Sequence, residues 1–326
     1  SSVFTQELIT QFRTTVTDAK TIGVCVHMDP DGDCLWAGLW LGGYLQQTGK
    51  TVRYFVPSKI SCVFNFLPEV TNFQEHIPSD YRPDIRISVD TATRERSNLR
   101  TLSTQTPIIH IDHHPSEAPR WTLNLINDQI SSTCEIITYL IQQQNPESIT
   151  PRLATLLCMG ISTDTGHFQR GKDLATTFSL TSFLLSRWAD LPFLVNNIYR
   201  ANDYLGTKFV WELMQRIMQE EGLIRVSVSQ SELEKNNLDE AKIEMLLHIM
   251  TDIKHDGIFL LFKHYPDANQ PYLKCSCRTK NTAIDVSKLA KQFGGWGHRA
   301  AAACRVVSDD LVKTQQDIIA QARLVV

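Results

Sequence analysis

Acidic and histidine side chains gather at four places in the sequence, and each place directly follows an apolar run. Such groups are disfavoured in a hydrophobic core, because burial of an unpaired polar group costs free energy. Carboxylate and imidazole groups are ligands for divalent ions, and a set without cysteine favours Mn²⁺, with Mg²⁺ or Zn²⁺ less favoured. The residues concerned are His27, Asp31, Asp33, Asp90, Asp112, His113, His114 and Asp164.

The size of this set predicts more than one metal ion. One ion needs about three protein ligands, whereas two ions about 3.5–4 Å apart that share a carboxylate would use the whole set. The alternative is that each Asp caps a helix and each His completes a hydrogen bond. We keep that ordinary interpretation for Asp29, His110 and His167, because the four clusters together are better explained by a metal site.

Alternating strands and helices are expected to position these residues. Apolar, β-branched runs predict strands at 21–27, 51–57, 85–90 and 107–112, and helical patterns cover 33–49, 131–144 and 150–161. Such alternation predicts an α/β fold with a mostly parallel sheet flanked by helices. Ligands bind outside the carboxyl ends of the strands in sheets of this kind, which is where the clusters fall.

The 326 residues are too many for one compact core, so we expect two domains. The first would span 1–187 and hold the metal site, 188–206 would form a helical connector, and 207–326 would form a smaller α/β domain across a cleft. In that smaller domain the patterns predict helices at 205–220, 231–248 and 284–293 and strands at 223–229, 257–264 and 273–279, followed by a last strand and helix.

A basic, glycine-containing segment lies in the second domain. From Lys254 to Arg305 there are nine Lys or Arg residues and three Asp residues, whereas the whole chain has a net charge of −3. Glycines let a backbone approach a phosphate closely, and arginine suits bidentate phosphate contact. The alternative for the glycines is a tight loop. The candidate substrate-binding residues are Arg278, Gly294, Gly295, Trp296, Gly297, His298 and Arg299.

The acidic segments resemble the four ordered motifs of the DHH phosphoesterase family. They read "HMDPDGD", "SVDTATRERS", "IDHHPS" and "GISTDTGHF", and "CSCRTKNTAIDVSKLAKQFGGWGHRAAAA" resembles the glycine–histidine motif of the C-terminal DHH-associated domain. The similarity runs from about residue 20 to 305. It is closest to the branch of short-oligonucleotide ("nano-RNA") phosphodiesterases and adenosine bisphosphate phosphatases.

The resemblance implies a role for each metal-site residue. His27, Asp31 and Asp90 would hold one Mn²⁺, and Asp33, Asp90, His113 and Asp164 would hold a second, with Asp90 as the bridge. Asp112 would orient a histidine, and His114 would face the phosphate.

The chain departs from the family pattern in its glycine motif. Trp296 stands where a third glycine is expected, and it could stack on a base or pack inward. Arg94 and Arg96 could flank the cleft, although surface exposure is the ordinary expectation for both.

The predicted function is Mn²⁺-dependent hydrolysis of very short oligonucleotides or linear dinucleotides to 5′-mononucleotides. The alternatives are removal of the 3′-phosphate from adenosine bisphosphate, cleavage of cyclic dinucleotides, or a silent nucleotide sensor. The charge of −3 argues against a partner of long nucleic acid. The apolar runs are too short to span a bilayer, and no signal peptide is visible. We therefore expect a cytoplasmic protein without a membrane partner, and the resemblance suggests a homodimer.

Overall fold

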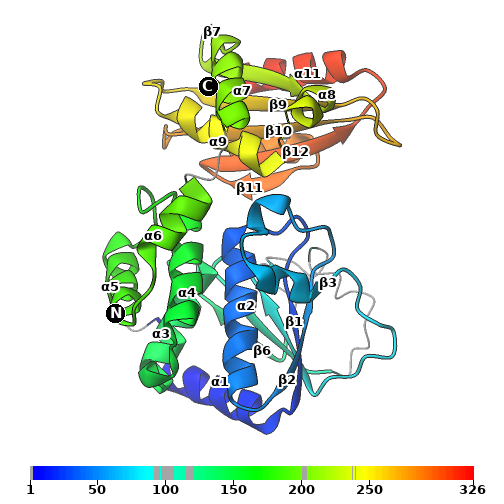
Figure 1. Ribbon diagram of the computed structural model, residues 1–326. Helices are drawn as coiled ribbons and strands as arrows, with labels where there is room; N and C mark the ends of the chain where they lie inside the picture. Colours follow the sequence, from blue (N-terminus) through cyan, green and yellow to red (C-terminus); the bar gives the residue numbers. More distant parts are fainter. Residues whose placement is uncertain are drawn as a thin grey trace. The chain divides into compact units, whose positions relative to one another are not determined.

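The computed structural model describes residues 3–91, 96, 106–114, 121–199, 204–236, 238 and 240–326 (Figure 1). The chain divides into two compact units, Ser1–Arg200 and Ala201–Val326. Each unit has its own sheet and its own hydrophobic core.

The sheet of the first unit has six strands in the order β3-β2-β1-β4-β5-β6, and every neighbouring pair is parallel. Its central strands are buried along nearly their whole length, as expected for a parallel sheet covered on both faces. Parallel pairing brings the carboxyl ends of neighbouring strands to one edge. The strands are β1 (Thr21–Cys25), β2 (Thr51–Phe55), β3 (Phe73–Gln74), β4 (Ile85–Val89), β5 (Ile108–Asp112) and β6 (Leu123–Ile126).

Helices flank this sheet, and α2, α3 and α4 pack against one another (Figure 1). Trp36 and Trp40 of α2 are buried in the core, as their i, i+4 spacing predicts. The helices are α1 (Gln6–Asp18), α2 (Gly32–Gln47), α3 (Thr133–Gln144), α4 (Pro151–Asp164), α5 (Leu174–Ser186) and α6 (Leu191–Leu194), with shorter turns η1 (Cys62–Phe64), η2 (Pro68–Asn72), η4 (Pro146–Ser148) and η5 (Val195–Tyr199).

The second unit has a mixed sheet in the order β11-β12-β10-β9-β8-β7, in which only β8 and β9 are parallel. Alternate residues of β9 enter two cores: Ile258, Leu260 and Phe262 face one, and Phe259 and Leu261 face the other. Its elements are α7 (Tyr204–Gln215), β7 (Met218–Glu220), β8 (Leu223–Ser229), α8 (Gln230–Lys235), α9 (Glu240–Thr251), β9 (Ile258–Tyr265), β10 (Tyr272–Thr279), α10 (Val286–Gln292), β11 (Trp296–His298), β12 (Ala301–Val307) and α11 (Leu311–Arg323).

The predicted bounds of two helices in the second unit were wrong. The helix expected at 205–220 ends at Gln215, because residues 218–220 pair with β8 as an edge strand. The helix expected at 231–248 is two helices: α8 ends at Lys235, and the N–H of Asn236 bonds back to the carbonyl of Glu232. Among the described residues, no helix combines the length and apolar character that crossing a membrane requires.

Candidate metal centre

The eight predicted metal-site residues lie together in the first unit. Their ligand atoms form three overlapping groups, and within each group the atoms lie within 4.8 Å of one another. Asp90 belongs to two groups and His113 to two, which joins the three into one site. The groups are His27, Asp31, Cys34 and Asp90; Asp90, Asp112, His113 and His114; and Asp33, His113 and Asp164.

Asp90 lies at the centre of this site with one carboxylate oxygen on each side. Its Oδ2 is 3.6 Å from Nε2 of His27, and its Oδ1 is 3.5 Å from Nε2 of His113. His27 Nε2 is also 3.7 Å from Asp31 Oδ2, and His113 Nε2 is 3.1 Å from Asp164 Oδ2. This is the placement that a bridging carboxylate requires, and its role as a bridge stays a prediction.

The backbone at Asp90 is unusual. Its φ is +55°, in the left-handed region that residues other than glycine rarely occupy. The residue directly follows β4, so this conformation turns the chain out of the strand at the point where the carboxylate must face the site.

The three residues of the DHH run point in different directions. Asp112 Oδ1 accepts hydrogen bonds from the backbone N–H of His114 at 2.9 Å and from its ring Nδ1 at 2.7 Å. Asp112 Oδ2 lies 3.3 Å from Nε2 of the buried His110. Asp112 therefore fixes His114, whereas His113 reaches the carboxylates of Asp164 and Asp90 through Nε2.

Asp33 is held by a helix start 100 residues further along the chain. The backbone N–H groups of Thr133 and Cys134, in the first turn of α3, donate to its Oδ2 at 2.6 Å and its Oδ1 at 3.0 Å. A helix N-terminus favours a negative charge. Thr133 Oγ1 also donates to Asp90 Oδ1 at 3.0 Å. From the sequence only the start of the helix could be predicted here, and these contacts could not.

Asp31 caps α2, since its Oδ1 accepts from the N–H of Cys34 at 3.1 Å while its Oδ2 lies near His27. Capping and metal binding are therefore not exclusive for this residue. Cys34 itself was not predicted. Burial raises the pKa of its thiol to about 11, which favours the protonated form over the thiolate that binds metals.

The pKa values of Asp33 and His113 are shifted by burial and by the charges crowded around them. Burial, followed by repulsion from Asp164 and Asp90, raises the pKa of Asp33 well above its usual range. Burial opposes protonation of His113, but the neighbouring Asp164 carboxylate prevails and raises its pKa to about 9. Oxygen and imidazole donors at this spacing fit divalent ions.

Two further cationic side chains lie beside the site. Lys172 Nζ donates to the backbone carbonyl of His113 at 3.2 Å, a contact that the sequence did not predict. Arg96 Nη2 lies 3.0 Å from Nδ1 of His27, so this arginine is at the site, as considered from the sequence. Arg94 lies outside the described residues. His167, kept as an ordinary histidine, has Nδ1 3.3 Å from Ser162 Oγ.

In the second unit, the local backbone structure explains why glycines occur in "GGWGH". Gly294 has φ +71° and follows α10, where its N–H and that of Gly295 donate to the carbonyls of Lys291 and Ala290. A Cβ at Gly295 would lie 2.2 Å from the carbonyl oxygen of Ala303, and one at Gly297 would lie 2.4 Å from Cα of Ala302. The tight-loop alternative therefore accounts for these glycines, and phosphate binding by their backbone stays a prediction.

Two polar residues of this motif lie at the same end of the second sheet. Arg278 on β10 and His298 on β11 both pair with Ala301 on β12, so the small alanine lies between them. Arg299 donates from Nε to the carbonyl of Thr282 at 2.8 Å. Trp296 is 44% exposed, which contradicts the alternative that it packs inward.

Comparisons with known proteins agree with the motifs. Residues 21–161 match the DHH family, N-terminal domain. The chain is 29% identical to the "Probable bifunctional oligoribonuclease and PAP phosphatase NrnA" of Streptococcus mutans, over 90% of this chain and 93% of that protein. It is 25% identical to the "Bifunctional oligoribonuclease and PAP phosphatase NrnA" of Mycoplasma pneumoniae, over 89% of each chain.

A solved structure shares the whole fold. The crystal structure of an exopolyphosphatase-related protein from Bacteroides fragilis superposes with a TM-score of 0.87 at 20% identity, covering 99% of this chain and 97% of that one. The fold class expected from the sequence is thereby confirmed. The candidate metal-site residues are gathered in one site, and the segment 21–161 is similar to the N-terminal domain of the DHH family.

Proposed function

We propose that this protein is a Mn²⁺-dependent phosphodiesterase that hydrolyses very short oligonucleotides or linear dinucleotides to 5′-mononucleotides. The observation that carries the proposal is Asp90, whose two carboxylate oxygens face ligand groups on opposite sides. The two relatives named as oligoribonucleases match nearly the whole chain, which supports a substrate of short RNA.

The proposed ligand sets are those that the family resemblance implies. His27, Asp31 and Asp90 would hold one ion, and Asp33, Asp90, His113 and Asp164 the other. When bound, two divalent ions supply an activated water near neutral pH and compensate the charge that develops on the phosphoryl oxygens. Mn²⁺ is proposed over Zn²⁺ because carboxylates outnumber imidazoles and the thiol beside them is held protonated.

The protein's own side chains orient the site and the substrate. Hydrogen bonds from α3 keep Asp33 in place, and Asp112 holds His114 through Nδ1. Burial opposes protonation of His114, but Asp112 and Asp90 raise its pKa to about 11. Protonated His114 would therefore donate from Nε2 to a phosphoryl oxygen of the substrate. Lys172, fixed on the His113 carbonyl, adds a second positive charge there.

The second unit would recognise the end of the substrate. Arg278 and His298, on either side of Ala301, offer cationic or hydrogen-bonding groups for a terminal phosphate. The exposed indole of Trp296 would stack on a base, a contact worth about 1–3 kcal/mol that tolerates any sequence. We also propose that the protein acts as a cytoplasmic homodimer.

A second activity, removal of the 3′-phosphate from adenosine 3′,5′-bisphosphate, is favoured by one specific observation. Both relatives described above carry the PAP phosphatase activity in their names together with the oligoribonuclease activity. The same metal centre would serve both reactions, because each breaks a phosphate ester bond.

Product analysis by chromatography tests these proposals. The protein with Mn²⁺ would be incubated separately with a 5′-phosphorylated diribonucleotide, a 20-mer RNA, adenosine 3′,5′-bisphosphate and a cyclic dinucleotide. We expect mononucleotides from the dinucleotide and little product from the 20-mer, and loss of all turnover in Asp90→Ala. Preferential turnover of the bisphosphate or the cyclic dinucleotide would reassign the substrate. No turnover of any substrate, with Mn²⁺ bound, would instead indicate a nucleotide sensor.

A further inference from the structure

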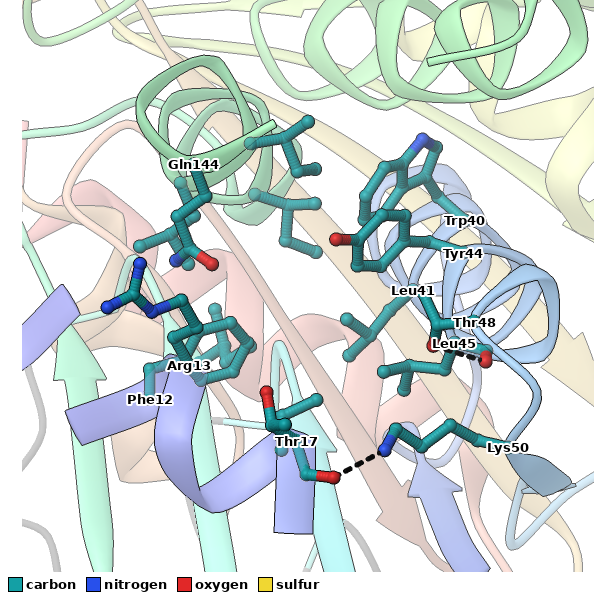
Figure 2. A pocket seen from close by; sticks show the side chains of 15 residues that line it. Phe12, Arg13, Thr17, Trp40, Leu41, Tyr44, Leu45, Thr48, Lys50 and Gln144 are labelled. Carbon is teal, nitrogen blue, oxygen red and sulfur yellow. Dashed lines mark hydrogen bonds between the residues drawn. The ribbon is translucent and has the colours of Figure 1, made fainter. Parts of the chain in front are cut away.

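A cavity lies in the first unit between α1, α2 and α3 (Figure 2). Its volume is about 200 Å³, and none of the eight predicted metal-site residues lines it. It is lined by Phe12, Arg13, Val16, Thr17, Trp40, Leu41, Tyr44, Leu45, Thr48, Lys50, Ile111, Ile137, Leu140, Ile141 and Gln144.

The walls of this cavity are mainly apolar. Leucine and isoleucine side chains of α2, α3 and β5 line it, and the rings of Trp40 and Tyr44 stack with their centroids 5.2 Å apart and an angle of 13° between them. An apolar cavity of about 150 Å³ in a protein core stays dry and binds benzene. A cavity of about 200 Å³ therefore has room for an apolar group of roughly eight carbon atoms.

The polar groups of the lining are positive or hydrogen-bonding, and no Asp or Glu is among them. Figure 2 shows Arg13 and Gln144 on one side of the cavity and the hydroxyl of Tyr44 turned towards its interior. Arg13 is exposed at the surface of α1. Within the described part of the chain, no carboxylate forms an ion pair with it.

Gln144 supplies an unused donor on the same side. Its Nε2 is buried and has no hydrogen-bond partner among the described residues. Rotation of the terminal amide by half a turn exchanges its oxygen and nitrogen at no steric cost. Nε2 would then face the cavity, where a ligand oxygen would satisfy it.

Lys50 is the other cationic side chain that lines the cavity, but its amino group already donates hydrogen bonds within the protein. Its Nζ donates to the carbonyls of Thr17 and Ala19 at 2.7 and 2.8 Å and so completes the end of α1. It contributes positive charge to the cavity while its hydrogen bonds remain within the protein.

We propose that this cavity is a binding site for a small amphipathic carboxylate with an unbranched apolar body of about eight carbon atoms. The apolar body would occupy the space between Leu41, Leu45 and Ile137, and the carboxylate would lie between Arg13 and Gln144. This proposed binding site takes no part in the proposed phosphodiesterase reaction, so a failure of either proposal leaves the other unaffected.

Calorimetric titration of the full chain with hexanoate, octanoate and 1-octanol tests the proposal. Octanoate is expected to bind about tenfold more tightly than hexanoate, because each buried methylene tightens binding about threefold to fourfold. Arg13→Ala is expected to weaken octanoate about threefold and to leave 1-octanol unchanged, since the charge lies at an exposed position. Arg82→Ala is the matched control, because Arg82 is an exposed arginine of the same unit that does not line the cavity.

Two substitutions that fill the cavity complete the test. Val16→Phe and Leu41→Phe each add a ring from a different helix, and either is expected to weaken octanoate at least tenfold, with folding checked by circular dichroism. Equal octanoate binding in a folded Val16→Phe or Leu41→Phe variant would place the ligand on the surface and overturn the proposal. Absence of octanoate binding to the unaltered protein at millimolar concentration would also overturn it.

Discussion

At the scale of single residues, the two adjacent histidines of the DHH run share one partner and differ in the other. Nε2 of His113 and Nδ1 of His114 lie 3.5 and 3.4 Å from Oδ1 of Asp90. His113 also reaches Asp164 through Nε2, whereas His114 is held by Asp112 through both its backbone and its ring. The difference predicts different consequences of substitution.

Replacement of each histidine by glutamine should separate metal binding from chemistry. His113→Gln is expected to weaken Mn²⁺ binding by at least about 100-fold, because the proposed ligand is lost and even a partner behind a ligand is worth about 10- to 100-fold. His114→Gln should keep Mn²⁺ affinity within about threefold and lower kcat about 100-fold, since an electrostatic contact to the phosphoryl group is removed. Mn²⁺ titration and steady-state kinetics with a dinucleotide measure the two effects. The reverse pattern would exchange the assigned roles.

At the scale of elements, close packing of helices sets the position of Asp33. α4 approaches α3 at Gly160, where a Cβ would lie 2.2 Å from Cys134 Sγ and 2.9 Å from Asp33 Oδ1. Cys134 is also one of the two residues whose N–H groups hold Asp33. A glycine in the middle of a helix is therefore part of the support of the metal centre.

Gly160→Ala should show this support directly. In an open helix, alanine would stabilise the fold by about 1 kcal/mol relative to glycine. Here overpacking should instead lower the free energy of unfolding by about 1–3 kcal/mol and weaken Mn²⁺ binding. Chemical unfolding and Mn²⁺ titration measure both quantities. Gly43→Ala on α2 is the control, because its nearest contact is one flexible Leu153 methyl at 3.2 Å. A stabilised Gly160→Ala protein would argue against this role.

Asp84 joins the start of β1 to β4 and gives a pH-dependent contribution to stability. Hydrogen bonds from the N–H groups of Thr21 and Lys20 and from the Thr21 hydroxyl lower its pKa below the usual value. Because the folded-state pKa lies below the unfolded one, the contribution is complete above the unfolded pKa. It is lost as the pH falls through the folded pKa.

The Asp84→Asn variant tests this linkage. Urea unfolding should find the variant less stable than the parent protein at pH 7, with the difference shrinking as the pH falls below about 4. Asp190→Asn, at an exposed helix cap, should change stability little, because asparagine caps a helix as well as aspartate does. A difference for Asp84→Asn that stays constant with pH would contradict the assigned hydrogen bonds.

Elements with strong local patterns could be predicted from the sequence, and contacts between distant segments could not. The run 223–229 alternates apolar and polar residues, and β8 has those bounds. β6 went unpredicted because its four residues include an asparagine and have no clear period. The eight candidate metal-site residues could be singled out because each lies at or near the end of a strand or helix. Their support by Thr133, Cys134 and Lys172 depends on tertiary packing, which no local pattern records.

At the scale of the whole molecule, the metal centre lies entirely within the first unit, so Mn²⁺ should stabilise that unit alone. At a free Mn²⁺ concentration 100 times the Kd, binding adds about 2.7 kcal/mol. For a unit of this size that should raise its Tm by about 5–10 °C. Differential scanning calorimetry with Mn²⁺ and with excess chelator measures the shift. His298→Ala in the second unit should leave it unchanged, and equal shifts of both units would indicate that they unfold together.

At Asp90, the left-handed backbone and the need for a carboxylate favour different residue types. Glycine would adopt φ +55° without strain, and asparagine tolerates it better than most residues. Backbone strain alone would therefore favour glycine over aspartate at the end of β4. Glycine offers no charged oxygens to the two sides of the site, and it would leave His27, His113 and the hydroxyl of Thr133 without their partner. Asp90→Gly should therefore relax the backbone and still lower the free energy of unfolding, because a buried charge loses its partner.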